Sequence, residues 1–294
     1  MIRSCDISTL LALIHDVELE TLAREEMERW YKELLANYTP DGEGMREMMR
    51  KTGAVITGTV ALEFLWGEAR GWSHGELEIV TRRGRFDEVW RYVEEHFGDG
   101  RTTDIVDLRD NRFAVAYQTR AVIEGTGKTI KVFESVEEDP LYPIPFHWST
   151  HMMNALGADV VVCPYPGLTL RGVGIYAQNG LGSLANLTRE TIHREWQRGF
   201  RLFGRAQKRS CAENAACARQ DRFMGDKWTM VVPLGQKSVR EAAETLQGEQ
   251  VTGWRLGGKT CGTSECFGSR VQAWTSMLTL EDEDTDAEGR KAVN

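Results

Sequence analysis

The sequence contains no apolar run long enough to cross a membrane. Its apolar stretches are short, such as Val160 to Cys163, whereas a bilayer-spanning helix needs about 20 consecutive apolar residues. A membrane span is therefore excluded. Leu10 to Ile14 is followed directly by polar and acidic residues and not by the small residues of a signal-peptide cleavage site. We expect a cytoplasmic or nuclear protein.

An excess of positive charge is also missing. The chain has 36 basic and 44 acidic residues, and its net charge of −8 gives no overall attraction to nucleic-acid phosphates or anionic membranes. Any nucleic-acid contact would have to be local. A Walker-type phosphate loop, a Rossmann glycine pattern and a serine nucleophile elbow are absent as well.

Cysteine is scarce, with six residues in 294, and no secretion signal accompanies them. We therefore interpret them as thiols or metal ligands and not as a disulfide framework. Cys211 and Cys217 form one pair, and Cys261 and Cys266 another, so four thiolates are available for a tetrahedral Zn²⁺ site. The spacings are looser than those of common zinc motifs, and free thiols are the alternative.

What the sequence does have is the composition of a packed protein. Hydrophobic residues make up 41% of the chain and there are 9 Trp, which is typical of a folded core. We divide the chain into four parts, which are a helical N-terminal region (1–44), an α/β core (45–160), a mixed C-terminal region (161–280) and an acidic tail predicted to be disordered (281–294).

Helical periodicity dominates the start of the chain, from Ile7 to Tyr38. Thr39 to Gly42 has the composition of a turn, and a second short helix is expected over Met45 to Lys51. Strands and helices then alternate, which predicts an α/β (α+β) fold with a mixed sheet flanked by helices. The expected strands are 54–57, 76–80, 113–123 and 129–134, and the expected helices are 60–66 and 86–97.

The C-terminal half is predicted to be mixed and to pack on this unit. A helix is expected within His147 to Leu156, and another from Thr188 to Phe203, whose buried face would carry Ile192, Trp196, Phe200 and Phe203. Three later strands are expected within 227–234, 251–256 and 271–280.

Two carboxylates carry the strongest chemical signal. Glu76 and Glu78 lie two residues apart on a predicted strand, so both side chains project from one face of the sheet. Such a pair suits Mg²⁺, which prefers hard oxygen ligands and keeps positions free for water and phosphate oxygens. Gly58 and Thr59 stand between the preceding strand and its helix, where backbone N–H groups can approach a phosphate. A solvated strand face is the alternative interpretation of the Glu pair.

The run from Met48 to Phe64, followed by Glu76 to Ile79, resembles the opening of the polymerase-β-type nucleotidyltransferase superfamily. A closer resemblance is to a group of fungal nucleotidyltransferase-like proteins, whose motifs are similar to 146–154, 165–170 and 225–229. The resemblance covers about residues 45 to 235 by pattern. It implies a nucleotidyltransferase-like fold, a nucleoside triphosphate as partner and Mg²⁺ as cofactor, but no particular nucleotide or acceptor.

The sequence departs from the superfamily pattern at the residues that matter for catalysis. Thr59 replaces the usual Ser, and Glu76 and Glu78 replace aspartates, which lengthens each carboxylate arm by about one bond. Glu134 is the candidate for the third carboxylate. The sequence therefore leaves two functions open, which are Mg-dependent nucleotidyl transfer and a catalytically inactive binding or scaffold role on the same fold.

His147 and His151 lie four residues apart and would share a helix face. No zinc-protease signature accompanies them, so a packing or hydrogen-bonding role is favoured over metal ligation.

Overall fold

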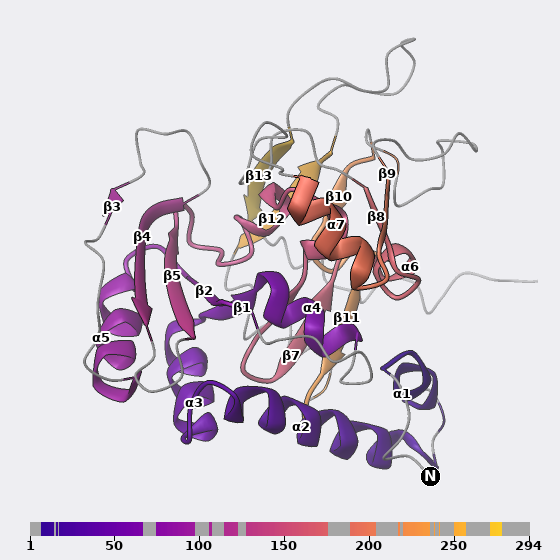
Figure 1. The fold of residues 1–294 in the computed structure, drawn as a ribbon, viewed down its shortest axis with the longest axis horizontal. Coiled ribbons are helices and arrows are strands. Elements are labelled where there is room, and N and C mark those ends of the chain that lie inside the picture. Colours follow the sequence, from indigo (N-terminus) through magenta and orange to yellow (C-terminus); the bar gives the residue numbers. More distant parts are fainter. Residues whose placement is uncertain are drawn as a thin grey trace, which may run out of the picture.

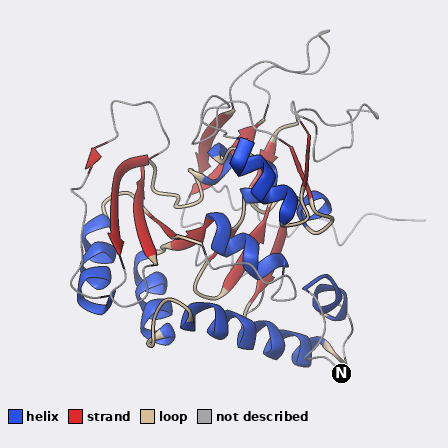
Figure 2. Cartoon of the chain, in the orientation of Figure 1, coloured by secondary structure: helices blue, strands red, loops and turns tan. Residues whose placement is uncertain are grey.

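The structure is a computed structural model that combines helices with three β-sheets (Figures 1 and 2). No helix in the described part of the chain is long and apolar enough to cross a membrane. The predicted mixed α/β class, with a mixed sheet flanked by helices, is confirmed. The described residues are 7–14, 16, 18–66, 75–97, 106–107, 115–122, 128–175, 189–203, 217, 220–235, 238, 241, 250–256 and 271–277.

The N-terminal region is helical, as predicted, with α1 (Ile7–Leu13), α2 (Glu20–Ala36) and α3 (Gly42–Thr52). The α3 helix begins earlier than the sequence indicated because Asp41 caps it, its carboxylate accepting a hydrogen bond of 2.8 Å from the Gly44 N–H. It ends at Gly53, whose φ of 69° lies in the left-handed region that terminates helices.

The largest sheet has eight strands in the order β11-β7-β6-β1-β2-β5-β4-β3. The β2 and β5 strands are parallel and their neighbours in the sheet are antiparallel. The parallel pair arises because helix α5 (Phe86–Phe97) follows β2 before the chain returns to the sheet. The bounds are β1 Val55–Thr57, β2 Leu77–Thr81, β3 Val106–Asp107, β4 Val115–Val122, β5 Thr129–Ser135, β6 Ala155–Leu156, β7 Val160–Cys163 and β11 Met230–Pro233.

Each face of this sheet packs into a different hydrophobic core. Ile56 and Ile79 face the core formed with α2, α3, α5 and α4 (Gly58–Trp66). Val55 and Val80 face a second core, to which the C-terminal residues Tyr165 and Trp254 contribute. The alternation of side chains along each strand therefore sorts the residues of β1, β2 and β5 between a helix-covered face and a face covered by the C-terminal region.

The C-terminal region contains a three-stranded sheet in the order β10-β12-β13 and a parallel pair, β8 and β9. Its bounds are α6 Pro166–Thr169, β8 Val173–Ile175, α7 Arg189–Gln197, β9 Arg201–Phe203, β10 Arg222–Phe223, β12 Gln250–Arg255 and β13 Gln272–Met277. Because β7 and β11 belong to the large sheet, that sheet continues beyond residue 160. The tail 281–294 lies outside the described residues.

Two predicted helices differ from the structure. Residues 147–156 contain only the 3₁₀ turn η5 (Thr150–Met152) and strand β6, after an earlier 3₁₀ turn η4 (Ile144–Phe146). The second helix ends at Gln197 because the chain turns at Gly199, where φ is 93°, and continues as β9. Of its predicted buried face, Ile192 and Trp196 are exposed, whereas Phe200 is buried.

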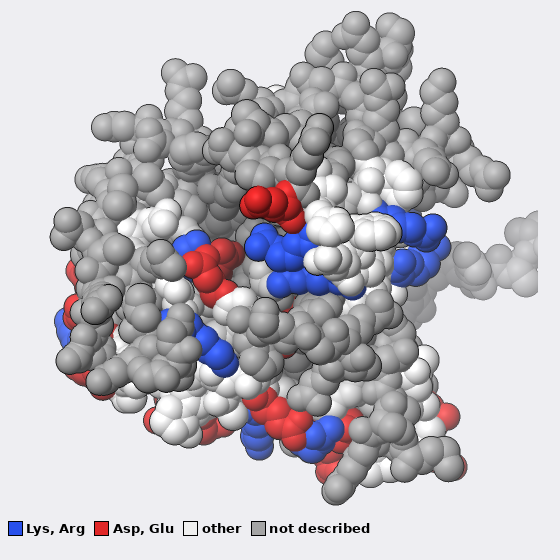
Figure 3. Space-filling model, viewed as in Figure 1, with Lys and Arg blue, Asp and Glu red and all other residues white. Residues whose placement is uncertain are grey.

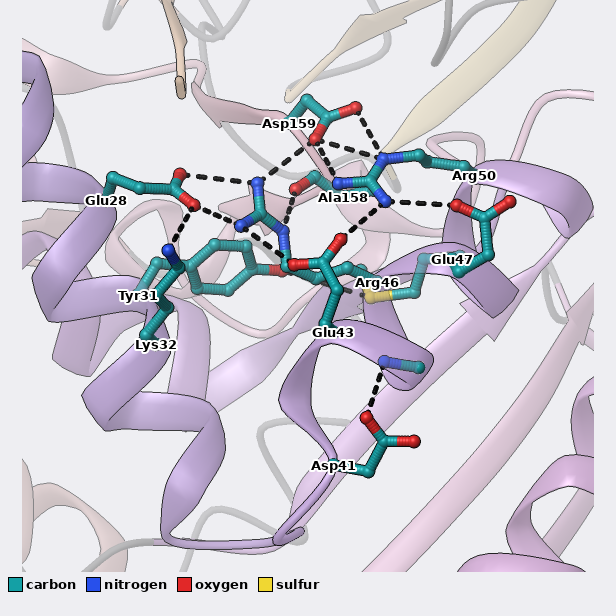
Figure 4. Close-up of polar contacts among 12 residues, drawn as sticks. Glu28, Tyr31, Lys32, Asp41, Glu43, Arg46, Glu47, Arg50, Ala158 and Asp159 are labelled. Carbon is teal, nitrogen blue, oxygen red and sulfur yellow. Dashed lines mark hydrogen bonds and ion pairs between the residues drawn. The ribbon is translucent and has the colours of Figure 1, made fainter.

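A polar cluster joins α2 and α3 to the turn between β6 and β7 (Figure 4). Asp159 is buried and its carboxylate accepts hydrogen bonds from Arg46 (3.0 Å) and from Arg50 (2.9 Å). Arg46 also donates to the carbonyl oxygen of Ala158 at 2.8 Å and pairs with Glu28. These contacts fasten the N-terminal helices to the sheet.

Candidate functional site

The candidate site lies where β1 ends and α4 begins. Thr57, the last residue of β1, is directly opposite Glu78 of the antiparallel strand β2, so their side chains share one face of the sheet. Gly58 follows with φ at 69° and opens α4. A Cβ atom at Gly58 would lie 2.3 Å from Oε2 of Glu78. The Glu78 carboxylate therefore occupies the space that only glycine leaves free at this turn.

The segment just before β2 lies against the turn between β1 and α4. A Cβ atom at Gly75 would lie 3.0 Å from the Thr59 side chain, and Tyr38 donates a hydrogen bond of 2.9 Å to the Gly75 carbonyl oxygen. Thr59 and Glu76 are both partly exposed. The structure thus brings Gly58, Thr59 and Glu78 together at the start of α4, with Glu76 beside them. The first N–H groups of α4 have no partner within the helix, which makes this end suited to an anion.

Lys131 is the basic residue of the site. It lies on β5 in parallel register with Glu78, on the same face of the sheet, and its ammonium forms an ion pair with Glu76. Burial raises the pKa of Glu78; the positive charge of Lys131 acts to lower it, and the charge of Glu76 adds to the increase. The two carboxylates therefore interact with each other and with one ammonium group.

Glu134, the predicted third carboxylate, is not placed with this pair. It lies three residues after Lys131 on β5, in register with Thr81, so its side chain is on the opposite, helix-covered face. There it is buried and accepts a hydrogen bond of 2.6 Å from the Gly84 N–H. Lys131 and Glu134 are an odd number of residues apart on one strand, so their side chains point to opposite faces of the sheet. The sheet therefore lies between Glu134 and Glu78.

His147 extends the site behind Thr57. The Thr57 hydroxyl donates to the Asn154 carbonyl oxygen at 2.9 Å, so the 2.9 Å contact between Thr57 Oγ1 and His147 Nε2 requires that His147 Nε2 carries the proton. Burial lowers the pKa of His147 to about 4, and nearby His151 lowers it further. A neutral His147 therefore holds Thr57, which is the hydrogen-bonding role favoured from the sequence.

His151 continues this buried polar chain to helix α7. Its Nε2 lies 3.4 Å from Glu195 Oε2, and its Nδ1 lies 2.9 Å from Ser149 Oγ. The three side chains have the order of a hydrolase triad, but all are buried, and a Cβ on Gly174 would lie 2.8 Å from the Ser149 hydroxyl. With no access for a substrate, the trio instead anchors α7. Burial acts to raise the pKa of Glu195, but His151 and Arg198 outweigh it and lower that pKa.

Only one of the four predicted zinc ligands lies within the described residues. Cys217 is buried and free, whereas Cys211, Cys261 and Cys266 lie outside the described residues. Within the described residues, no three His, Cys, Asp or Glu side chains gather in a way that could hold a metal ion. Burial raises the pKa of Cys163 to about 12, so that thiol is unreactive.

The donor set at the β1–α4 turn fits one Mg²⁺ ion. Glu76 and Glu78 supply two carboxylates, and Mg²⁺ combines such protein oxygens with water and phosphate. A pair of metal ions does not fit, because Glu134 is on the other face and Lys131 already supplies a positive charge. Sequence reasoning missed Lys131: its odd separation from Glu134 on a predicted strand shows that the two side chains lie on opposite faces, but only the register of β2 and β5 decides which of them faces Glu78.

The chain matches no known protein family, and no curated protein has a similar sequence. Among solved structures, it is similar to the Thermotoga maritima CCA-adding enzyme complexed with tRNA, with a TM-score of 0.36 and 14% sequence identity. The similarity covers 68% of this chain and 42% of that enzyme's chain, so this protein spans less than half of it.

Proposed function

We propose that this protein is a nucleotidyltransferase-like protein that binds a nucleoside triphosphate at the β1–α4 turn. One Mg²⁺ ion would be held by Glu76 and Glu78, and the phosphates would lie against Gly58, Thr59 and the N-terminal end of α4. The observation that carries the proposal is the position of the Glu78 carboxylate against Gly58. It supports the proposal because this carboxylate oxygen lies at the start of α4, where a phosphate would approach the helix.

The proposed reaction is transfer of a nucleotidyl group. The oxygen of an acceptor hydroxyl would attack the α-phosphorus and lose its proton to solvent, the bond from that phosphorus to the bridging oxygen would break, and pyrophosphate would leave. Mg²⁺ supplies charge neutralisation for such a transfer. On this chain, the two carboxylates would hold that ion, and His147 keeps Thr57 fixed beside them.

A second function is favoured by the ion pair between Glu76 and Lys131. If the ammonium permanently occupies the place of the metal, the fold serves as a catalytically inactive binding or scaffold protein. Lys131 then provides the positive charge, and neither Mg²⁺ nor transfer is needed.

Binding of a fluorescent ATP or GTP analogue, measured with Mg²⁺ and with EDTA, tests the proposal. We expect Glu76→Gln and Glu78→Gln each to weaken Mg-dependent binding about tenfold or more, because each removes a charged ligand. Glu33→Gln is the matched control, since Glu33 is a similarly exposed glutamate (42%, against 39% for Glu76) that also pairs with a basic residue.

Lys131→Met separates the two functions. If the protein depends on Mg²⁺, this substitution removes the ammonium that competes with the metal for Glu76. Nucleotide binding should then depend more strongly on Mg²⁺, and the affinity for Mg²⁺ should rise. Nucleotidyl transfer should also release pyrophosphate from the triphosphate. In the inactive protein, wild type shows no Mg-dependent nucleotide binding, and none of the variants changes this. That second outcome would contradict the proposal.

The pH dependence provides a further prediction. Metal binding needs the ionised carboxylate, and the pKa of Glu78 is raised in the folded protein. Mg-dependent binding should therefore strengthen as pH rises through a value above that of an ordinary glutamate, and this step should be absent in Glu78→Gln. A wild-type binding curve that does not rise with pH, or a rise that persists unchanged in Glu78→Gln, would count against the assignment.

A further inference from the structure

Helix α7 exposes an aromatic side chain where the sequence pattern predicted a buried one. Trp196 is 66% exposed, and Ile192, one turn earlier, is 36% exposed. The helix instead buries Glu195 on its inner side, where His151 and Arg198 bind the carboxylate. The inner contacts fix the helix, so Trp196 is held on the outside by the way α7 is anchored.

Basic residues lie near this position, and the exposed Glu190 lies in the first turn of the helix. The Arg194 side chain is 61% exposed, and Arg201 and Arg171 are exposed as well. Arg171 and Arg201 are brought close because the Arg201 N–H donates to the carbonyl oxygen of Gly172 at 2.7 Å. Figure 3 shows uncoloured side chains over the position of α7 with Lys and Arg on both sides of them.

The local charge is opposite to that of the whole chain. Within the described segment 189–203 the sequence contains four Arg and two Glu, a charge of +2 in a protein whose net charge is −8. One of the two acids, Glu195, is buried, so it adds little to the surface charge. A polyanion would be attracted here, although the molecule as a whole would not attract it.

From this surface, defined by Arg171, Arg194, Trp196 and Arg201, we infer a binding site for single-stranded nucleic acid. Exposed bases stack on aromatic side chains, and arginines beside them bind the phosphates, without the need for a particular sequence. The Trp196 indole lies beside the His193 imidazole, with ring centroids 5.7 Å apart and planes 32° from parallel, which enlarges the aromatic surface.

A partner helix or an acidic protein fits this surface less well. Docking of an amphipathic helix uses apolar residues that recur along several turns. On α7 only Ile192 and Trp196 are exposed large apolar side chains, and the exposed residues between and beside them are His193, Arg194 and Gln197. One flat aromatic group among cations matches a stacked base better than an apolar groove or ridge. This inference goes beyond the proposed nucleotide site and does not depend on it.

Fluorescence anisotropy with labelled 12-nucleotide oligo(U) and oligo(dT) tests the inference on the full chain. Wild type should bind both single strands, more tightly than a duplex of equal length. Trp196→Ala should weaken binding about tenfold or more, because one stacked base is lost. Trp196→Phe keeps an aromatic ring and should lose less affinity. Leu22→Ala is the matched control, since Leu22 is also an exposed apolar residue on a helix (48%).

The arginines are tested through salt dependence. The double variant Arg194→Gln, Arg201→Gln should make the slope of log affinity against log salt shallower by about 1 to 2, as expected for two lost contacts to a single strand. Arg91→Gln, at an exposed position of α5, should leave the slope unchanged. Glu78→Gln should leave oligonucleotide binding intact, which separates this site from the nucleotide site.

Three results would overturn the inference. One is no binding of either oligonucleotide by wild type at low salt, and another is equal binding by Trp196→Ala, which would leave only charge attraction. The third is polyglutamate displacing the oligonucleotide with the same dependence on Trp196, which would assign the surface to an acidic protein. Circular dichroism of each variant verifies that the fold is unchanged.

Discussion

At the scale of single residues, Gly58 links backbone geometry to the chemistry of the site. Its φ of 69° is one that side-chain-bearing residues rarely adopt, and its missing Cβ leaves room for the Glu78 carboxylate. Gly58→Ala should lower the free energy of unfolding by about 1 kcal/mol through the backbone strain. It should also displace Glu78, and so weaken Mg-dependent nucleotide binding about tenfold or more.

Gly84→Ala is the control for the backbone strain, so that comparison with it isolates the displacement of Glu78. Gly84 has a similar φ of 75°, but a Cβ atom there would meet no atom within 4 Å. Urea unfolding should therefore give similar losses for the two variants, whereas nucleotide binding should be lost only in Gly58→Ala. Equal nucleotide affinities in both variants would show that the Glu78 carboxylate has no part in binding.

The site was predictable in part from the sequence. The spacing of Glu76 and Glu78 and the Gly58–Thr59 step indicated residues that do lie together, because a strand period of two and a strand-to-helix turn are local features. Strand pairing is not local. The parallel register of β2 and β5 decides that Lys131 faces Glu78 and that Glu134 does not, and no residue near either one encodes it.

At the scale of elements, Asp159 is one of the residues that attach α3 to the sheet (Figure 4). It is 5% exposed and accepts hydrogen bonds from both Arg46 and Arg50. Asp159→Asn would remove the charge that both guanidinium groups share. We expect a loss of about 3 kcal/mol in unfolding free energy, at the low end of the range for breaking a buried ion pair because Glu28 still binds Arg46.

Glu47→Gln is the control for this change, because Glu47 pairs with the same Arg50 but is 73% exposed. Its effect should stay within about 0.5 kcal/mol, as for other surface ion pairs. Urea unfolding followed by tryptophan fluorescence measures both variants. A loss in Asp159→Asn no larger than in Glu47→Gln would mean that the cluster adds little to stability.

Elements were predicted well where their pattern is local and less well where tertiary contacts decide. Helix α5 was predicted at its observed bounds because its apolar stripe and its acidic face agree. The helix expected over 188–203 is observed but ends at Gln197, because the helical spacing of Phe200 continues by chance beyond Gly199, where the chain turns. The carboxylate of Glu195, drawn inward by His151, then turns Trp196 to the outside.

At the scale of the whole molecule, the large sheet unites both halves of the sequence. Strand β7 pairs with β6 and with β11, which comes from residues 230–233. Trp254 and Tyr165 cover the face of the sheet that carries Val55 and Val80. The division at residue 160, which the change in sequence pattern suggested, therefore runs through a continuous sheet and a shared core.

A fragment of residues 1–160 should not fold cooperatively. It would keep β1, β2 and β5 but lose nearly all of β7, all of β11 and the C-terminal side chains that bury Val55 and Val80. The uncovered apolar face and the unpaired edge of β6 should then promote aggregation and binding of a hydrophobic dye.

A chain that ends after Leu280 keeps every described strand, and its melting temperature should stay within about 2 °C of wild type, since an acidic segment without apolar periodicity contributes little to a core. Differential scanning calorimetry compares the two, and a sharp melting transition in the 1–160 fragment would show that the first half forms an independent domain after all.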